Sequence, residues 1–390
     1  MCTDTEGVAA VRLSCDQADL QRALSQVSRA VSKKSTLQVL GNILIASDGE
    51  RLKLAATNLE IAIAAWIDAE IAEPGSLTVR ADLLTEFVSS LPSSPVQMEL
   101  DRRSLALRLT CGHSKANIKG IPAEDFPEIA TIGEGEPTAR IDASTLREMV
   151  AQVAFAAATD DSRPVLAGVL TEFTGDTLTM AAADGFRLSV RTANLLAPPA
   201  EPIAVIVPAR ALQELARIIG DQAEAVDLTI TPNRSQLLAR AGAIEFMSRL
   251  IDGNFPNVRQ IIPPEFGTRM VVSRDEFLAA ARRAKLFAQS SNDVVRIQIN
   301  PGDSQLDPGF ATVSAQAAEA GDNEDYLEAR IEGPAAHIAF NGRYLSDVLA
   351  VIHGSEIALE MTTPNAAGVI RPVGDDSYTH VIMPMVIGNL

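Results

Sequence analysis

Few residues in this chain are placed to do chemistry, and their spacing argues against a catalytic centre. Two carboxylate pairs, Asp160-Asp161 and Asp375-Asp376, are of the type that can hold Mg²⁺, although such pairs are more often found in turns. The chain has four histidines, none at metal-ligand spacing from another ligand type: His113, His337, His353 and His380. Phosphate-binding glycine loops, the G-x-S-x-G elbow and H-E-x-x-H are absent. The sequence therefore predicts a non-catalytic protein without metal or cofactor; the rival is an enzyme whose site leaves no motif.

Two apolar segments are candidate binding surfaces. Asp184-Gly185 predicts a tight turn between strands, and Phe186, Arg187 and Leu188 follow it directly. In the second segment, Val381 and Ile382 predict a core strand, whereas 383–385 (Met-Pro-Met) predicts a partly exposed groove wall because proline stops strand pairing. Methionine side chains adapt to many shapes, so such a wall suits the binding of several partners.

The charge of the chain is strongly acidic, yet its cations cluster. Lys and Arg number 33 against 50 Asp and Glu, a net charge of −17, which disfavours long-range attraction to nucleic acid. Cations recur on the polar faces of predicted helices: Arg22, Arg29, Lys33, Lys34, Arg210, Arg217, Arg282, Arg283, Lys285 and Arg343. Solvated helix faces with scattered salt bridges would give this pattern. The alternative, favoured by its repetition, is a basic surface that follows a phosphate backbone without reading sequence.

The elements that must position these residues recur three times, at a spacing of roughly 130 residues. Segments 121–127 and 250–256 close the first two copies with similar sequences, and 381–385 closes the third. A predicted strand runs straight into a predicted helix in each copy: at 77–84, 205–212 and 338–345. The recurrence predicts a tandem architecture of three similar domains.

Six amphipathic helices follow from apolar residues at helical spacing. The stripes are Leu20, Leu24, Val27 and Val31; Leu84, Phe87, Val88 and Leu91; Leu146, Met149, Val150 and Val153; Leu212, Leu215, Ile218 and Ile219; Phe277, Leu278 and Ala281; and Leu345, Val348, Leu349 and Ile352. Ser273 and Glu276 form a capping box before the fifth helix. Alternating segments such as 51–56 and 177–182 predict strands with one buried face. The fold class is therefore α+β, with helices on one side of a sheet layer.

The compartment follows from what the sequence lacks. There is no secretory signal and no apolar run of the roughly 18 residues that a membrane span needs. Cys2, Cys15 and Cys111 are widely spaced and have neither disulfide nor zinc-site spacing. A reduced cytoplasmic location fits best.

The whole chain resembles the bacterial DNA polymerase III β subunit family, the sliding clamps. Its best markers are the segments 37–42 (LQVLGN), 183–188 (ADGFRL), 205–208 (VIVP), 250–256 (LIDGNFP) and 381–385 (VIMPM), in this order. The resemblance implies three clamp domains, at 11–130, 131–258 and 259–390, after a disordered extension at 1–10. It implies a ring of two chains joined head to tail, with helices inside and antiparallel sheets outside.

The same resemblance implies the function and the partners. The ring would encircle duplex DNA without sequence preference and confer processivity on the polymerase. Short linear peptides from the DNA polymerase III α subunit, the clamp loader, other polymerases and repair proteins would bind a cleft between the second and third domains. A protein-binding repeat scaffold that never touches DNA is the distant alternative.

Site residues carried over by position fall into three sets. The implied peptide cleft comprises Leu166, Ala183, Gly185, Phe186, Arg187, Leu188, Pro256, Ile261, Val381, Ile382, Met383, Pro384 and Met385. The implied DNA-binding set, with the helix cations above, is Arg22, Arg29, Lys33, Lys34, Arg210, Arg282, Arg283 and Asn341. The implied dimer interface is Leu83, Phe87 and Ile118 against Leu286 and Phe287, with Glu319 and Glu324 beside it. Ala183, Phe186 and Ala209 depart from common family residues, which leaves peptide preference and DNA-contact strength open.

Overall fold

The computed structural model describes most of the chain. The described residues are 11–32, 35–101, 104–133, 136–160, 162–220, 224–290, 292–302 and 309–385. The predicted extension at 1–10 and the predicted DNA-binding residues Lys33 and Lys34 lie outside them.

The chain forms two compact units, each built on one long antiparallel sheet. The first comprises Met1–Ala143 and Glu214–Leu250, and the second comprises Ser144–Gln213 and Ile251–Leu390. These units cut across the expected domains because strands of successive repeats pair with each other. In the first unit β4 (Ile61–Asp68) pairs with β17 (Ile244–Arg249), and in the second β13 (Arg187–Asn194) pairs with β25 (Tyr378–Ile382).

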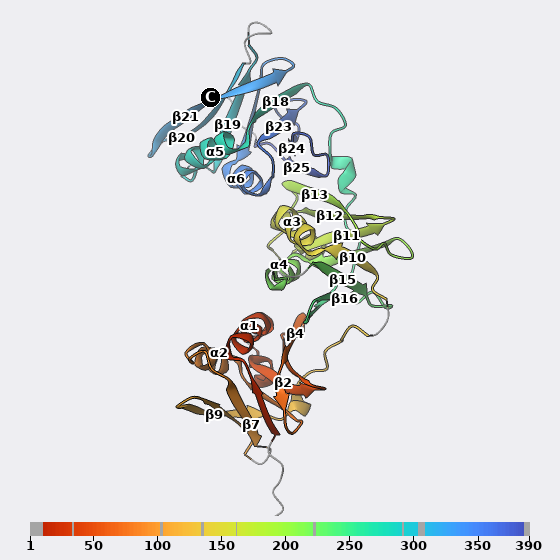
Figure 1. Cartoon of the computed structure of the whole chain (residues 1–390). Helices are drawn as coiled ribbons and strands as arrows, with labels where there is room; N and C mark the ends of the chain where they lie inside the picture. The colour runs from red at the N-terminus through yellow and green to blue at the C-terminus, as the bar shows by residue number, and fades with distance from the viewer. Residues whose placement is uncertain are drawn as a thin grey trace, which may run out of the picture. The chain divides into compact units, whose positions relative to one another are not determined.

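The described residues contain six α-helices, which Figure 1 labels, and a strand precedes each of them. They are α1 (Gln17–Val27), α2 (Ala81–Ser89), α3 (Ala143–Val153), α4 (Ala209–Ile218), α5 (Arg274–Ala288) and α6 (Gly342–Val351). All but α1 begin at the residue that follows a strand, and α1 begins after a single N-cap residue, Asp16. The predicted strand-to-helix passage is confirmed, and it occurs twice in every repeat.

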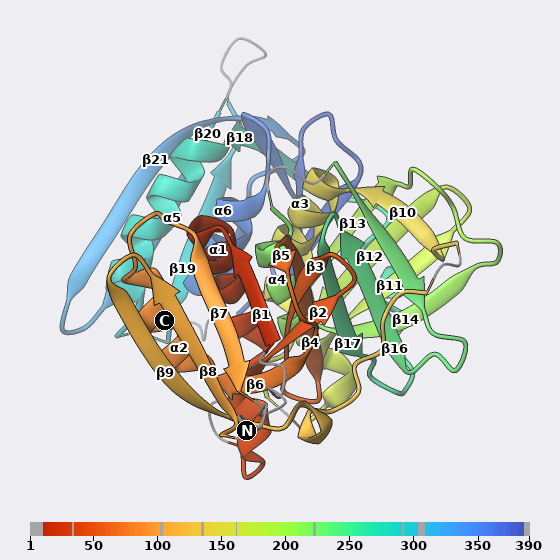
Figure 2. The ribbon, with the colours of Figure 1, turned by 60° about the horizontal axis from the view of Figure 1, so that its bottom comes forward.

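The strands of the first unit make one sheet within the described residues. Its order is β10-β15-β16-β17-β4-β3-β2-β6-β9-β8-β7-β1-β5. Besides β4 and β17, these strands are β1 (Val11–Cys15), β2 (Asn42–Asp48), β3 (Arg51–Thr57), β5 (Glu70–Ile71), β6 (Ser76–Arg80), β7 (Val96–Asp101), β8 (Ala106–Cys111), β9 (Ser114–Ile121), β10 (Ala139–Asp142), β15 (Ala225–Ile230) and β16 (Gln236–Ala241). Figure 2 shows β7, β8 and β9 running beside one another.

The second unit has the corresponding sheet. Its order, over the described residues, is β14-β11-β12-β13-β25-β24-β23-β18-β21-β20-β19-β22. Besides β13 and β25, these strands are β11 (Gly168–Thr174), β12 (Thr177–Ala183), β14 (Ile203–Pro208), β18 (Thr268–Ser273), β19 (Val294–Asn300), β20 (Phe310–Ala317), β21 (Gly321–Glu332), β22 (Ala336–Asn341), β23 (Glu356–Met361) and β24 (Gly368–Pro372).

The cores lie between helices and sheets, as the apolar stripes predict. Every stripe residue is buried except Val31 and Phe87, which are half-buried. Val31 lies beyond α1, because the helix tightens into a 3₁₀ turn at Ser28–Ala30. In the third repeat α5 packs against α6 and β20, and the Ser273 hydroxyl accepts a hydrogen bond from the Glu276 amide as predicted. Within the described ranges, none of the helices combines the length and the apolar character that a bilayer crossing requires.

Candidate functional site

The turn between β12 and β13 presents a large apolar side chain to solvent. One carboxylate oxygen of Asp184 accepts hydrogen bonds from the amides of Phe186 and Arg187, at 2.9 and 3.0 Å. Gly185 has φ +96°, a conformation that side chains with a Cβ rarely adopt. The predicted tight turn is thus confirmed, and the side chain of Phe186 is left 60% exposed.

The end of β25 places Met383 opposite Phe186. Strand pairing joins Arg187 to Ile382, and the next residue, Met383, donates its amide hydrogen to the Phe186 carbonyl at 2.8 Å. The strand ends at Ile382, before Pro384, as the sequence predicts. Met383 is 42% exposed, so two large apolar side chains from segments almost 200 residues apart share one surface.

A buried apolar layer supports this surface. Ala183, Leu188 and Val381 belong to one hydrophobic cluster, and residues of the 255–262 segment pack against it. In that segment Ile261 is 45% exposed and Pro256 is also exposed. The predicted cleft residues therefore divide: Phe186, Met383, Ile261 and Pro256 offer surface, whereas Leu166, Ala183, Leu188, Val381 and Ile382 are buried beneath it.

Arg187, one of the residues implied for the peptide cleft, is not part of the exposed apolar surface. Its side chain is buried, with Nε donating to Asp184 and Nη1 to Asp347, at 3.0 and 2.8 Å. Nη2 donates to the Phe155 carbonyl, and the guanidinium carbon lies 5.2 and 4.4 Å from the ring centres of Phe155 and Tyr344. Arg187 therefore ties the turn to α6, and three of its five N–H groups donate within the chain. The sequence analysis missed the three residues that contact Arg187, because no motif marks them: Phe155, Tyr344 and Asp347.

A second buried polar group lies in the seam between β13 and β25. His380 is fully buried, and its Nδ1 lies 2.6 Å from the hydroxyl of Ser189, its strand partner. The ring of Phe155 stacks on it at 5.5 Å. Burial, helped by the charge of Arg187, lowers the pKa of His380 to about 3, so the imidazole is neutral at physiological pH.

The predicted DNA-binding cations are only partly free. Arg22 pairs with Asp19 at 3.0 Å, Arg29 with Glu214 at 3.2 Å, and Arg283 with Asp325 of β21 at 2.6 Å. Arg210 and Arg282 are exposed, and neither forms an ion pair with another described residue. Asn341 is the N-cap of α6, where its side-chain oxygen accepts from the amides of Arg343 and Tyr344. That cap fixes the side chain, so its amide nitrogen is the part left for an outside acceptor.

The sequence matches three successive domains of one family over most of its length. Residues 11–130 match the N-terminal domain of the DNA polymerase III beta subunit, 140–257 its central domain and 259–386 its C-terminal domain. This chain belongs to the DNA polymerase III β subunit family.

Relatives and solved structures agree over almost the whole chain. The beta sliding clamp of Synechococcus elongatus is 32% identical over 378 residues, which is 96% of this chain and 99% of that protein. That of Bacillus subtilis is 30% identical over 376 residues, 94% of this chain and 97% of its own. The B. subtilis clamp structure superposes with a TM-score of 0.91 at 28% identity and covers 97% of this chain and 100% of that one. A Pseudomonas aeruginosa sliding clamp bound to griselimycin, also 28% identical with the same coverage, has a TM-score of 0.88. The chain is thus a sliding clamp subunit, a non-catalytic processivity factor.

The residues expected at the clamp's dimer interface lie on α2 and β9 in the first unit, and on α5, β21 and the turn before β21 in the second. Leu83 and Leu286 are exposed, the latter by 67%, and Phe87 and Phe287 are half-buried. Glu319 and Glu324 are exposed. Ile118 differs from the expectation, because its side chain is only 3% exposed and lies in the hydrophobic core of the chain.

Parts of β9 and β21 have backbone groups that pair with no second strand, and the exposed side chains of the two strands are oppositely charged. In β9, residues 114–119 pair with β8 and, among the described residues, with no second strand; in β21, residues 321–328 pair with β20 alone. The exposed side chains of β9 include Lys115 and Lys119. Those of β21 include Asp322, Glu324 and Glu328.

The first unit of the clamp repeats the turn geometry of the apolar surface with different side chains. The Asn58 side chain accepts from the amides of Glu60 and Ile61, as Asp184 does in the second unit. Arg249 donates its amide to the Glu60 carbonyl at 2.9 Å, as Met383 does to Phe186. Glu60 and Arg249 therefore occupy in the first unit the positions that Phe186 and Met383 occupy in the second. The backbone arrangement is the same, but these two positions carry charged side chains.

Proposed function

We propose that two copies of this clamp subunit close head to tail into a ring around duplex DNA. The observation that carries the proposal is the pair of complementary edges. A basic edge at β9 and an acidic edge at β21 suit each other as antiparallel neighbours, whereas two copies of the same edge would repel. Leu83 and Leu286 add exposed apolar surface for this contact.

Duplex DNA would be held mainly by topology. The exposed cations Arg210 and Arg282 provide screened, sequence-independent attraction to phosphates. The net charge of the whole chain, −17, disfavours binding to DNA that is not encircled. Such a ring needs no strong contact to stay on its template.

The surface formed by Phe186, Ile261 and Met383 would receive short linear peptides. Exposed apolar anchors over a rigid, buried layer suit the side chains of an extended peptide. The partners are the DNA polymerase III α subunit, the clamp loader, other polymerases and repair proteins, so that the ring keeps the polymerase on its template. The site of action is the cytoplasm, where the buried free thiols Cys15 and Cys111 remain reduced.

Loading onto circular DNA tests the proposal. With clamp loader and ATP, the protein is expected to stay on a nicked circle through gel filtration in moderate salt and to leave once the circle is cut. The double variant Phe186→Ala, Met383→Ala should lose polymerase stimulation yet keep the dimer mass of the unchanged chain. Equal retention on linear and circular DNA would overturn the ring proposal.

A further inference from the structure

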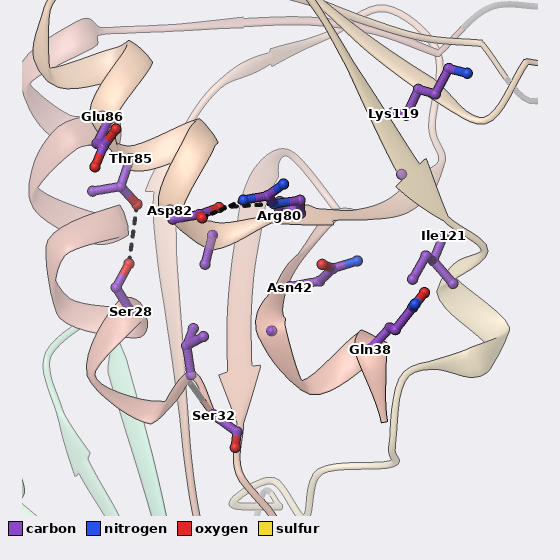
Figure 3. A pocket seen from close by; sticks show the side chains of 14 residues that line it. Ser28, Ser32, Gln38, Asn42, Arg80, Asp82, Thr85, Glu86, Lys119 and Ile121 are labelled. Atoms are coloured by element: carbon purple, nitrogen blue, oxygen red, sulfur yellow. Dashed lines mark hydrogen bonds and ion pairs between the residues drawn. The ribbon is translucent and has the colours of Figure 1, made fainter. Parts of the chain in front are cut away.

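The edge of β9 has a fixed pattern of free backbone groups. The Gly120 amide donates to the carbonyl of Leu105, next to β8, at 2.7 Å. Successive residues of an antiparallel strand turn their N–H and C=O groups to opposite sides, so the even-numbered residues of β9 bond to β8. The groups left for a second strand belong to Lys115, Asn117 and Lys119, whose side chains are also exposed. Figure 3 shows the Lys119 side chain extending away from the pocket next to β9, so its ammonium group is open to solvent.

The edge of β21 has the complementary pattern. The Ala329 amide donates to the carbonyl of Gly309, next to β20, at 3.3 Å, so the odd-numbered residues of β21 bond to β20. Within 321–328, the groups left for a second strand belong to the even-numbered residues, and their side chains are exposed: Asp322, Glu324, Tyr326 and Glu328. Tyr326 is 69% exposed, and its ring centre lies 6.0 Å from that of Phe310 on β20. This edge therefore presents an aromatic side chain between two carboxylates.

Backbone pairing restricts how the two edges can meet. In an antiparallel pair, residues directly opposite each other both turn their backbone groups toward the partner strand, or both turn them away. Odd-numbered residues of β9 must therefore lie opposite even-numbered residues of β21. A slip of one residue would set free groups against occupied ones and would move the charged side chains to the other face. Only registers that differ by two residues remain.

We propose that the two copies of the ring meet with Asn117 of one copy opposite Tyr326 of the other, an inference that rests on the proposed function. This register sets a lysine opposite a glutamate on either side of the central pair: Lys115 with Glu328, and Lys119 with Glu324. None of these four charged side chains forms an ion pair with another described residue of its own chain. Each lysine also lies on a diagonal from Tyr326, ~7–8 Å away between Cα atoms, so its aliphatic stem can cover the exposed ring.

The neighbouring registers lose these pairs. A shift of two residues that sets Lys119 opposite Tyr326 brings Lys115 opposite Arg330, which is a like charge and already pairs with β18 on that side. The opposite shift sets Lys115 opposite Tyr326 and leaves only Lys119 facing a carboxylate, that of Asp322. Charge therefore favours the register centred on Asn117 and Tyr326.

Disulfide trapping in the full chain tests the register. In a Cys2→Ser background, Asn117→Cys with Tyr326→Cys sets two thiols ~5.5 Å apart between Cα atoms at each contact, within the ~4.4–6.8 Å that a disulfide spans. Mild oxidation, at a concentration where sedimentation shows the dimer, should convert most of this variant to a covalent dimer on a non-reducing gel. The controls combine Asn117→Cys with Glu324→Cys or with Glu328→Cys. These pairs are diagonal, ~7–8 Å apart, and should stay largely monomeric on the gel.

Paired charge reversal checks the register without cysteines. Lys115→Glu faces Glu328 in the proposed register, so the dimer dissociation constant should rise about fivefold for each of the two contacts at low salt. Adding Glu328→Lys should restore the affinity. Adding Glu324→Lys instead should not restore it, because the new lysine faces Lys119.

The outcomes separate the register from the ring. If a diagonal cysteine pair forms the covalent dimer instead, or if all three pairs form it equally, the register is wrong and the ring stands. Equal rescue by Glu328→Lys and Glu324→Lys would also overturn the register alone. If the unchanged chain sediments as a monomer at every concentration, the ring fails and the register fails with it.

Discussion

At the scale of single residues, the structure reassigns the most conspicuous cation of the candidate surface. Arg187 follows an apolar turn in the sequence, so an exposed role was a reasonable expectation. Its ion-pair partner Asp347 lies 160 residues further along the sequence, so no local sequence pattern predicts the pair. A buried ion pair of this kind adds little net stability, but loss of one member leaves a buried charge uncompensated. Arg187 is best understood as the residue that fixes where Phe186 points.

His380 makes stability depend on pH. Its pKa is about 3 in the folded chain against about 6.5 when unfolded, so between these values the unfolded state binds the extra proton and stability falls as pH falls. From pH 7 to pH 5 the free energy of unfolding should drop by about 2 kcal/mol through this group. His380→Asn should remove that part of the drop, as measured by urea unfolding at one protein concentration. His113→Asn, in an exposed turn, is the control and should keep it; an unchanged drop in His380→Asn would contradict the assignment.

At the scale of elements, much of the fold could be predicted. The apolar stripes predict all six helices, and Ser273 predicts the start of α5, because helical spacing and capping are local properties. Strand partners across repeats could not be predicted. The pairing of β4 with β17 and of β13 with β25 joins segments far apart in the chain, and it moves the boundaries of the compact units. The exposed members of the candidate surface, Phe186 and Met383, were predicted, whereas the buried role of Ile118 was not.

The proposed pairing of β9 with β21 predicts how charge reversal at either strand changes dimer affinity. Lys115→Glu with Lys119→Glu reverses the charge of the β9 edge, so the proposed contact with β21 becomes repulsive, and the dimer dissociation constant should rise at least about tenfold at low salt. Glu324→Lys with Glu328→Lys reverses the other edge and should weaken the dimer similarly. Sedimentation over a concentration series measures both.

The combination of all four substitutions provides the control. Opposite charges face each other again, so the dissociation constant should return towards that of the unchanged chain, whatever the register of the two strands. A quadruple variant as weak as either double variant would contradict pairing between these edges.

At the scale of the whole molecule, divergence between the repeats accounts for where partners bind. One backbone arrangement occurs at Asn58–Ile61 and again at Asp184–Arg187, with matching hydrogen bonds to the following repeat. In the second case Phe186 and Met383 are exposed there, whereas in the first the matching positions carry Glu60 and Arg249, beside the exposed Leu59. A peptide with apolar anchors would have to desolvate Glu60 and Arg249 without compensation, which costs more than the contact returns.

Substitution can give the turn of the first unit the apolar side chains of the turn in the second. Glu60→Phe with Arg249→Met, together with Leu59→Gly to match Gly185, should create a second apolar surface on the same backbone. Leu59 already has φ 75°, so glycine fits there without strain. Isothermal titration with a polymerase α-subunit peptide that saturates the unchanged chain at one per chain should then approach two per chain, with weaker affinity at the new site. Glu60→Ala with Arg249→Ala removes the charges without supplying anchors and should stay at one. If the grafted chain folds and still binds one peptide, the shared backbone does not suffice, and the buried layer around Leu188 and Val381 must contribute the specificity that the two exposed side chains do not.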